Sequence, residues 1–188
     1  VKIGSLRFAL GSLILYVFMP LLPTYPQSLF AQSTLGSALY VITFLLLFDL
    51  LFYWYHRAEH HFNWAWPLHE LHHSDAELNV TSSFRTHWLE TPVQFIFVVL
   101  PCYYLLGIDS VGYIIATSLI VAQLLLTHSN LKIGYGWFGR ILCSPQMHRI
   151  HHSILREHRG KNLCQMFPVL DIVFGTYHHP AKDEYPVT

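Results

Sequence analysis

Residues 35–60 read LGSALYVITFLLLFDLLFYWYHRAEH, and residues 35–55 of this stretch form an apolar run that only Asp49 interrupts. A helix needs roughly 20 consecutive apolar residues to cross the hydrocarbon core of a bilayer, so this run is long enough to span a membrane. His56 and His60 follow it directly. Because they are four positions apart, a continuing helix would project both imidazoles from one face.

Three further apolar runs cover residues 6–22, 92–107 and 111–127. Each is close to the practical minimum of about 17 residues for a membrane span. We expect an all-α fold, namely an integral membrane helical bundle of about four membrane helices with a cytosolic, histidine-rich helical cap. The cap would comprise residues 56–91 and 128–188, and residues 1–188 would form a single domain.

The composition pairs few charges with many histidines. Of the 188 residues, 53% are hydrophobic and 12% are charged, and all 14 histidines follow residue 55. These values exclude a disordered chain and a nucleic-acid binder that relies on excess basic charge. Without a C-x-x-C pair, the three cysteines are expected to be reduced and buried: Cys102, Cys143 and Cys164. The chain begins at Val1 rather than at methionine, which leaves open that an N-terminal piece is missing.

The basic residues are distributed on one side of the expected bundle. If all four runs cross the membrane, the loops on the far side are residues 23–34 and 108–110, and neither contains lysine or arginine. All 11 basic residues then fall on the near side or at the near end of a span. The positive-inside rule therefore places the histidines on the cytoplasmic face.

Two copies of the pattern H-x-x-H-H are present: His69, His72 and His73, and His148, His151 and His152. On a helix, positions i, i+3 and i+4 lie on one side, so each triplet would place three imidazoles within reach of one or two metal ions. With His56 and His60 the imidazoles exceed what one tetrahedral zinc can use. Imidazole suits zinc, copper, iron and nickel. We expect two ions and favour iron because it can activate dioxygen, although ligand number leaves two zinc ions open.

These motifs resemble, in order, the signatures of the fatty acid hydroxylase/sterol desaturase superfamily. The first two are Asp49-Leu-Leu-Phe-Tyr-Trp-Tyr-His-Arg-Ala-Glu-His60 and His69-Glu-Leu-His-His-Ser74. The next is an N…R-x-H…E stretch from Asn79 to Glu90. The third histidine block is His128-Ser-Asn130 with Pro145-Gln-Met-His-Arg-Ile-His-His-Ser153, and the closing element is Asp171-Ile-Val-Phe-Gly-Thr-Tyr177. The resemblance covers residues 49–177.

The resemblance implies an integral-membrane, non-haem di-iron oxygenase that hydroxylates or desaturates a lipid with dioxygen and electrons from a redox partner. Candidate substrates are sterols, fatty acyl chains, ether lipids and carotenoids. Candidate electron donors are a cytochrome b5-like protein or a ferredoxin, and no nucleic-acid partner is expected. The cofactor would be two iron ions, which zinc could replace in the isolated protein. Matching the motifs assigns eight metal ligands: His56, His60, His69, His72, His73, His148, His151 and His152. His128 is the candidate ninth, because related membrane di-iron enzymes place a lone histidine between the last membrane helix and the final cluster.

Eight further residues are candidates to orient these ligands: Asp49, Tyr53, Glu59, Glu70, Arg85, His87, Asn130 and Asp171. An ionisable residue inside a span is costly and usually faces the protein interior. We therefore expect Asp49 to bond Tyr53, or an arginine or histidine of another segment, or else to contribute polar helix packing. Glutamates beside the clusters could orient imidazole N–H groups or stay solvated: Glu59, Glu70 and Glu90. The remaining unmatched histidines are expected to face solvent or to be hydrogen-bonded: His61, His158, His178 and His179.

Near Asn162 the sequence departs from the family, which often has N-[YF]-G where this chain has Asn162-Leu-Cys164, and this leaves the local substrate or lid geometry open. Two other classes of protein stay open: a dizinc membrane hydrolase or lyase, and a non-enzymatic membrane protein that binds haem or transports metal. Haem ligation favours histidine pairs within the spans, and a transporter needs polar ligands near the midplane. No histidine lies within an expected span and only Asp49 is charged at that depth, which favours the oxygenase.

Overall fold

The computed structural model describes residues 13, 28–30 and 33–188, and the regular secondary structure of these residues is entirely helical. This result confirms the expected all-α class. The apolar run at 6–22 lies outside the described residues apart from Leu13. Two described helices, α2 (Thr34–His61) and α6 (Ser110–Thr127), are long and apolar enough to cross a membrane. A four-helix count and a cytosolic cap stay predictions.

Helix α2 begins at a side-chain cap and extends past its apolar run. The Ser33 hydroxyl accepts a hydrogen bond from the Gly36 N–H at 3.1 Å, which satisfies a donor that the first helical turn leaves free. The helix continues to His61, so His56 and His60 lie in its last two turns. One rigid element therefore carries both a membrane-length apolar segment and two candidate ligands.

The run predicted at 92–107 is a continuous helical stretch with an irregular centre. It consists of α4 (Glu90–Gln94), a π-helical turn η4 (Phe95–Val99) and α5 (Leu100–Leu106). Pro101 has no N–H to donate, so the regular ladder of the preceding turn cannot be completed there. A π turn beside the proline is a local adjustment to this loss. Gly107, with a φ of 69°, then ends the stretch.

Helix α6 packs closely against α2. Its cap, Asp109, accepts hydrogen bonds from the N–H groups of Val111 and Gly112 and from the Ser37 hydroxyl of α2. The ring of Tyr40 lies so near Gly112 that a Cβ added there would be 2.6 Å from it. Only glycine permits this approach of the two helices.

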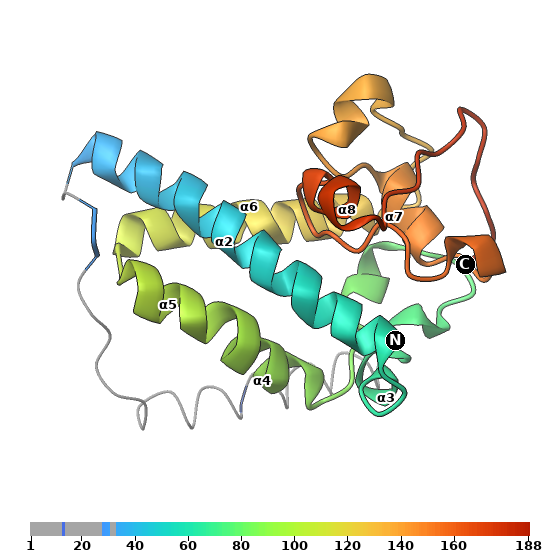
Figure 1. The fold of residues 1–188 in the computed structure, drawn as a ribbon, viewed down its shortest axis with the longest axis horizontal. Coiled ribbons are helices and arrows are strands. Elements are labelled where there is room, and N and C mark those ends of the chain that lie inside the picture. The colour runs from blue at the N-terminus through green and yellow to red at the C-terminus, as the bar shows by residue number, and fades with distance from the viewer. Residues whose placement is uncertain (1–12, 14–27, 31–32) are drawn as a thin grey trace.

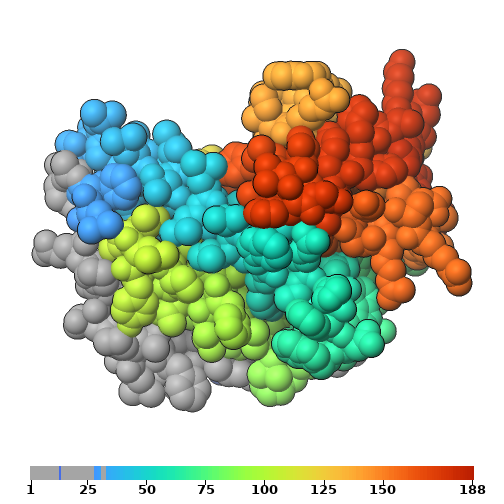
Figure 2. Space-filling model, viewed as in Figure 1, coloured from blue at the N-terminus to red at the C-terminus, as the bar shows by residue number. Residues whose placement is uncertain are grey.

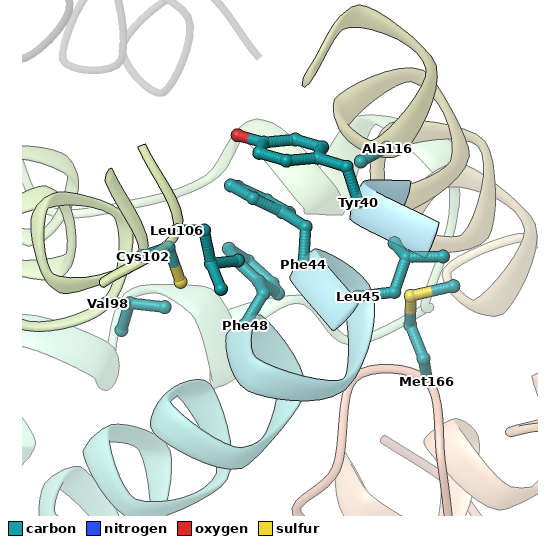
Figure 3. Packing of buried hydrophobic residues seen from close by; sticks show 9 residues of the cluster. All are labelled: Tyr40, Phe44, Leu45, Phe48, Val98, Cys102, Leu106, Ala116 and Met166. Atoms are coloured by element: carbon teal, nitrogen blue, oxygen red, sulfur yellow. The ribbon is translucent and has the colours of Figure 1, made fainter. Parts of the chain in front are cut away.

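Figure 3 shows the apolar core between these helices, formed by Tyr40, Phe44, Leu45, Phe48, Val98, Cys102, Leu106, Ala116 and Met166. Along α2 the rings of Tyr40, Phe44 and Phe48 stack in series, with centroid separations of 5.8 and 6.3 Å. Met166 comes from a loop near the C-terminus and joins the same core. The long helices and the C-terminal part of the chain therefore share one interior.

The remaining elements gather at one end of α2 and α6 (Figure 1). They are α3 (Trp66–His69), η2 (His72–Ser74), η3 (Val80–Phe84), η5 (Gly136–Arg140), α7 (Pro145–His151), η6 (Arg156–His158) and α8 (Val169–Phe174). Figure 2 shows the C-terminal residues, drawn orange to red, packed against the teal segment that ends α2 and follows it. The three cysteines are free and buried, as predicted.

Candidate metal centre

The structure gathers the nine histidines named above into two clusters. The five-histidine cluster consists of His56, His60, His69, His73 and His151. The four-histidine cluster consists of His72, His128, His148 and His152. Within each cluster, one ring nitrogen from every member lies within 4.8 Å of the others. Every histidine proposed as a ligand from the sequence falls in one of the two, and no other histidine does.

Each H-x-x-H-H motif divides between the clusters. His69 and His73 join the five-histidine cluster, whereas His72 joins the four-histidine cluster. The motif on α7 divides in the opposite sense, because its first and last histidines join the four-histidine cluster and His151 joins the other. On α7 the i+3 position projects from a different side of the helix than the i and i+4 positions, so the middle histidine reaches the neighbouring cluster. Each H-x-x-H-H motif therefore contributes histidines to both clusters.

The two motifs have different backbones. The second lies on α7, which Ser144 caps by accepting a hydrogen bond from the Met147 N–H at 3.2 Å. The first is not one α-helix, since α3 ends at His69 and the 3₁₀ helix η2 begins at His72. The expectation of a single helix was wrong for this motif, although the turn keeps the side chains converging.

In the five-histidine cluster the Nε2 atoms face one another. His56 Nε2 lies 2.9 Å from His69 Nε2 and 3.2 Å from His60 Nε2, and His73 Nε2 lies 3.1 Å from His69 Nε2. On the outer side of the ring, His56 Nδ1 is 2.8 Å from the Leu163 carbonyl oxygen. A carbonyl only accepts, so neutral His56 carries its proton on Nδ1 and presents the lone pair of Nε2 to the cluster.

The same reasoning applies to the ring of His151. His151 Nδ1 donates to the Lys161 carbonyl at 3.0 Å, while its Nε2 is buried and has no hydrogen-bond partner among the described residues. His69 Nδ1 is 2.9 Å from Glu90 Oε1, and burial raises the pKa of Glu90 well above its usual value. His56 and His151 therefore each present a buried Nε2 lone pair to the five-histidine cluster. Neutral imidazoles that converge in this way are metal ligands, so the residues fit a metal ion.

The four-histidine cluster repeats the arrangement around His128. Its Nδ1 is 2.8 Å from the Leu124 carbonyl oxygen, and its Nε2 is 3.0 Å from the Nε2 atoms of both His72 and His148. Burial lowers the pKa of His128 to about 4 and the pKa values of His72 and His148 well below the usual 6.5. These imidazoles are therefore neutral at pH 7, the state in which they can bind a metal.

Two carboxylates flank His69 on the side away from the cluster. Glu90 Oε1 lies 2.9 Å and Glu59 Oε2 3.5 Å from His69 Nδ1. Both side chains are buried. A carboxylate behind a metal-binding imidazole fixes the orientation of the ring and raises its basicity. Glu59 and Glu90 thus lie where the sequence placed orienting groups, whereas Glu70 is exposed.

Asp49 is buried, but its partners differ from those predicted. Its carboxylate accepts hydrogen bonds from three consecutive backbone N–H groups, of Gln165, Met166 and Phe167, at 2.6–3.0 Å. The expectation of Tyr53, arginine or histidine as its partner was wrong, since a carboxylate inside the fold is satisfied equally well by backbone amides.

Asp171 binds the backbone just before the three residues that Asp49 contacts. It accepts hydrogen bonds from the N–H groups of Leu163 and Cys164 at 2.7 and 3.0 Å. Leu163 is the residue whose carbonyl accepts from His56. Asp49 and Asp171 therefore reach the histidine site through the backbone of residues 163–167.

The other candidate orienting residues lie at the edge of the site. The Tyr53 hydroxyl pairs with Thr176 Oγ1 at 2.8 Å and accepts from Arg57. Arg85 forms an ion pair with Asp75. Asn130 accepts from Arg149 at 2.9 Å, and the Leu89 N–H donates to His87 Nδ1 at 3.2 Å. The unmatched histidines His158 and His178 both hydrogen-bond Glu184.

A cavity of about 140 Å³ adjoins both clusters. Histidines from each cluster line it, as do apolar side chains of α2 and α6: Phe48, Phe52, Ile120 and Leu124. Its polar wall includes Ser83, Thr86 and Gln165. Sequence reasoning missed these three residues because serine, threonine and glutamine carry no metal-ligand spacing; only the position of the first two inside the N…R-x-H…E stretch pointed to this region.

The fatty acid hydroxylase family model matches residues 41–176. Ornithine lipid hydroxylase OlsE of Rhizobium tropici is 29% identical over 145 residues, which cover 77% of this chain and 44% of that protein. Human alkylglycerol monooxygenase is 28% identical over 129 residues, covering 69% of this chain and 28% of that protein. Very-long-chain aldehyde decarbonylase GL1-6 of Oryza sativa is 25% identical over 92% of this chain and 28% of its own length. No solved structure matches. The chain spans less than half the length of each of these relatives.

Proposed function

The chain belongs to the fatty acid hydroxylase family, and from that membership and the histidine clusters we propose that it is a membrane-bound, non-haem di-iron oxygenase that hydroxylates or desaturates a lipid. The observation that carries the proposal is the pair of buried clusters in which the Nε2 atoms of neighbouring imidazoles converge to 2.9–3.2 Å. Imidazole suits zinc, copper, iron and nickel, and among these we favour iron because it can activate dioxygen.

We propose that the five-histidine and four-histidine clusters each hold one iron ion. Bound there, the irons would supply the dioxygen-activating chemistry that no amino-acid side chain possesses. The protein groups hold the imidazoles in the ligating tautomer, because the carbonyls of Leu163, Leu124 and Lys161 accept the outer N–H groups of His56, His128 and His151. Glu90 Oε1 lies 2.9 Å from the outer nitrogen of His69 and orients that ring.

We propose that the membrane bundle has four spans, residues 6–22, 35–55, 92–107 and 111–127, with the cap of 56–91 and 128–188 on the cytoplasmic face in one domain. Large apolar side chains are exposed along α2, α5 and α6: Leu35, Leu39, Ile42, Leu46, Leu105, Val111, Ile114, Ile115, Leu119 and Val121. Exposed apolar surface of this extent suits hydrocarbon rather than water. A lipid would then reach the cavity at the end of α2 and α6 from within the bilayer.

The substrates in the names of the relatives support the proposal that the substrate of this chain is a lipid with a polar group. They are an ornithine lipid, an alkylglycerol and a very-long-chain aldehyde. Each oxidation of a C–H bond with dioxygen also consumes two electrons, so we propose a one-electron carrier such as a cytochrome b5-like protein or a ferredoxin as partner.

The test is metal analysis and lipid profiling of the full chain. Protein purified without oxygen from iron-replete cells should contain two irons per chain and consume dioxygen when reduced. Mass spectrometry of lipids from expressing cells should reveal a species that has gained one oxygen or lost two hydrogens. Zinc alone in the protein, together with an unchanged lipid profile, would overturn the proposal and favour a dizinc enzyme.

A further inference from the structure

Unpaired polar atoms concentrate in the cavity beside the histidines. Within the described residues, nine buried side-chain nitrogen and oxygen atoms make no hydrogen bond, and seven of them belong to residues that line this cavity. Four belong to residues that are neither histidines nor glutamates, and one of these, Tyr55 OH, interacts with Glu59, which leaves Ser83 Oγ, Thr86 Oγ1 and Gln165 Nε2. Ser83 and Gln165 are 5% and 6% exposed.

Other buried hydroxyls of the same region are satisfied. Thr127 donates to Gln123 O at 3.0 Å, Thr176 donates to Asp171 at 2.7 Å, and Ser82 donates to Asp75 at 2.6 Å. Leaving a buried polar group without a partner costs about 1–3 kcal/mol. Three such groups facing one cavity therefore point to a ligand that supplies the missing hydrogen bonds.

The chemistry of the cavity wall restricts that ligand. Gln165 Nε2 only donates, and the hydroxyls of Ser83 and Thr86 can donate or accept, so the ligand must offer an acceptor oxygen. No lysine or arginine lines the cavity, and Glu59 and Glu90 do, which disfavours an anionic phosphate or carboxylate. A neutral oxygen remains, as in a hydroxyl, an ether or a carbonyl.

The volume places this oxygen close to the reacting carbon. The cavity of about 140 Å³ is lined by histidines of both clusters, including His56 and His128, and holds only a short piece of a lipid. We propose that Ser83, Thr86 and Gln165 bind a neutral oxygen-bearing group of the lipid, so that the oxidised carbon lies within a few bonds of that group rather than far along the chain. This inference rests on the proposed oxygenase function.

The reaction balances with the electron carrier already proposed. In hydroxylation one C–H bond and the O–O bond break, one oxygen enters the new C–OH group, and the other leaves as water with two protons and two electrons from the carrier. In desaturation two C–H bonds break and both oxygens leave as water, with the same demand for two electrons. The polar contacts select the carbon and take no part in electron transfer.

Three near-isosteric variants test the contacts: Ser83→Ala, Thr86→Val and Gln165→Met. Because each wild-type group is unpaired without ligand, its removal should leave the thermal unfolding temperature unchanged or raise it. Binding of an oxygen-bearing lipid should weaken by about tenfold per variant. The matched control is Thr117→Val on α6, whose hydroxyl donates to Tyr113 O at 2.8 Å away from the cavity; it should leave lipid binding unchanged.

The probes are hexadecan-1-ol, its methyl ether and hexadecane, each equilibrated with the metal-loaded full chain in the same micelles. The ratio of variant to wild-type affinity cancels partitioning into detergent. The alcohol and the ether should show the tenfold loss, whereas hexadecane should show none. Fragmentation mass spectrometry should then locate oxidation near the oxygen of the alcohol and the ether.

The possible outcomes distinguish a failure of this inference from a failure of the proposed oxygenase function. Equal effects on all three probes, or a fall in unfolding temperature for the three variants, would show that the groups are structural and would overturn the inference. Oxidation near the methyl end of the alcohol would overturn it while leaving the oxygenase intact. Selective loss of alcohol and ether binding without any oxidised product would support the polar site and count against the oxygenase.

Discussion

At His69, one buried ring meets two carboxylates and two other imidazoles. Its Nε2 faces His56 and His73 at 2.9 and 3.1 Å, and its Nδ1 faces Glu90 at 2.9 Å. The ring thus connects the five-histidine cluster to two buried carboxyl groups. A carboxylate in this position increases the electron density that the opposite nitrogen offers to a metal.

Replacing the carboxyl group behind His69 tests this link. Glu90→Gln keeps the size of the side chain and an acceptor oxygen but removes a group that can carry negative charge. We expect metal affinity to fall about 10- to 100-fold, measured by competition with a chelator. The control Glu70→Gln alters an exposed glutamate and should leave affinity unchanged. Equal affinities in the two variants would contradict the role given to Glu90.

Removing a candidate ligand from either cluster should have a larger effect. His72→Ala and His151→Ala each delete a converging imidazole, so metal content, measured by mass spectrometry of the digested protein, should fall by at least half and activity should disappear. The exposed His179 provides the control, since His179→Ala should change neither. His158→Ala should keep the metal but unfold more easily, because its buried ring is 3.0 Å from Glu184 Oε1. Full metal content in His151→Ala would remove that residue from the site.

At the scale of elements, the loop of residues 163–167 connects the long helix α2 to the cap through hydrogen bonds. Asp49 of α2 holds the end of this loop through three backbone N–H groups, and Asp171 of α8 holds its start. Between them, the Leu163 carbonyl accepts from His56. Two carboxylates thus fix one backbone segment, which in turn fixes a candidate ligand.

Asp49→Asn should reveal this dependence. The amide offers one acceptor oxygen where the carboxylate offers two, and its NH₂ group faces donors rather than acceptors. We expect a loss of about 3 kcal/mol in the free energy of unfolding, measured by denaturant unfolding in detergent. Weaker metal binding should accompany it, because the Leu163 carbonyl would shift. Unchanged stability would mean that the loop does not depend on Asp49.

The sequence predicted the helices and the clustered histidines far better than it predicted these contacts. Continuous apolar runs located the helices near residues 35–55, 92–107 and 111–127. Histidine spacing located eight members of the two clusters, and the resemblance to the family supplied the ninth, His128. The partners of Asp49 could not be predicted, since backbone amides of residues distant in the chain leave no pattern of side chains. Ser83 and Gln165 were missed for a related reason, because their significance lies in lacking a partner within one cavity.

At the scale of the whole molecule, the C-terminal segment holds α7 in place. Gln146 donates to the Ala181 and Glu184 carbonyls, Arg149 donates to the Pro186 carbonyl, and the Ile154 N–H donates to Val187. Helix α7 carries the second H-x-x-H-H motif and contributes to both clusters. The histidine site is therefore assembled from the long helix α2, the end of α6 and a cap secured by the last residues of the chain.

Such an assembly should be sensitive to acid when it holds no metal. Burial lowers the pKa of His128 to about 4. Burial and the neighbouring imidazoles also lower the pKa values of six other histidines well below 6.5: His69, His72, His73, His148, His151 and His152. Above the unfolded-state value of about 6.5 these groups are neutral in both states and do not affect stability. Below it the unfolded chain binds protons that the folded chain does not, so stability falls with pH.

The expected slope is steep, because each such histidine contributes up to about 1.4 kcal/mol per pH unit between about pH 6.5 and its folded-state pKa. Metal-free protein should therefore lose most of its stability between about pH 6.5 and 5, as measured by thermal unfolding across that range. Bound metal competes with these protons and binds only the folded state, so the loaded protein should unfold at a lower pH. His179→Ala should leave the slope unchanged, since that ring is exposed. A metal-free protein equally stable at pH 7 and pH 5 would contradict the burial of neutral imidazoles on which both clusters depend.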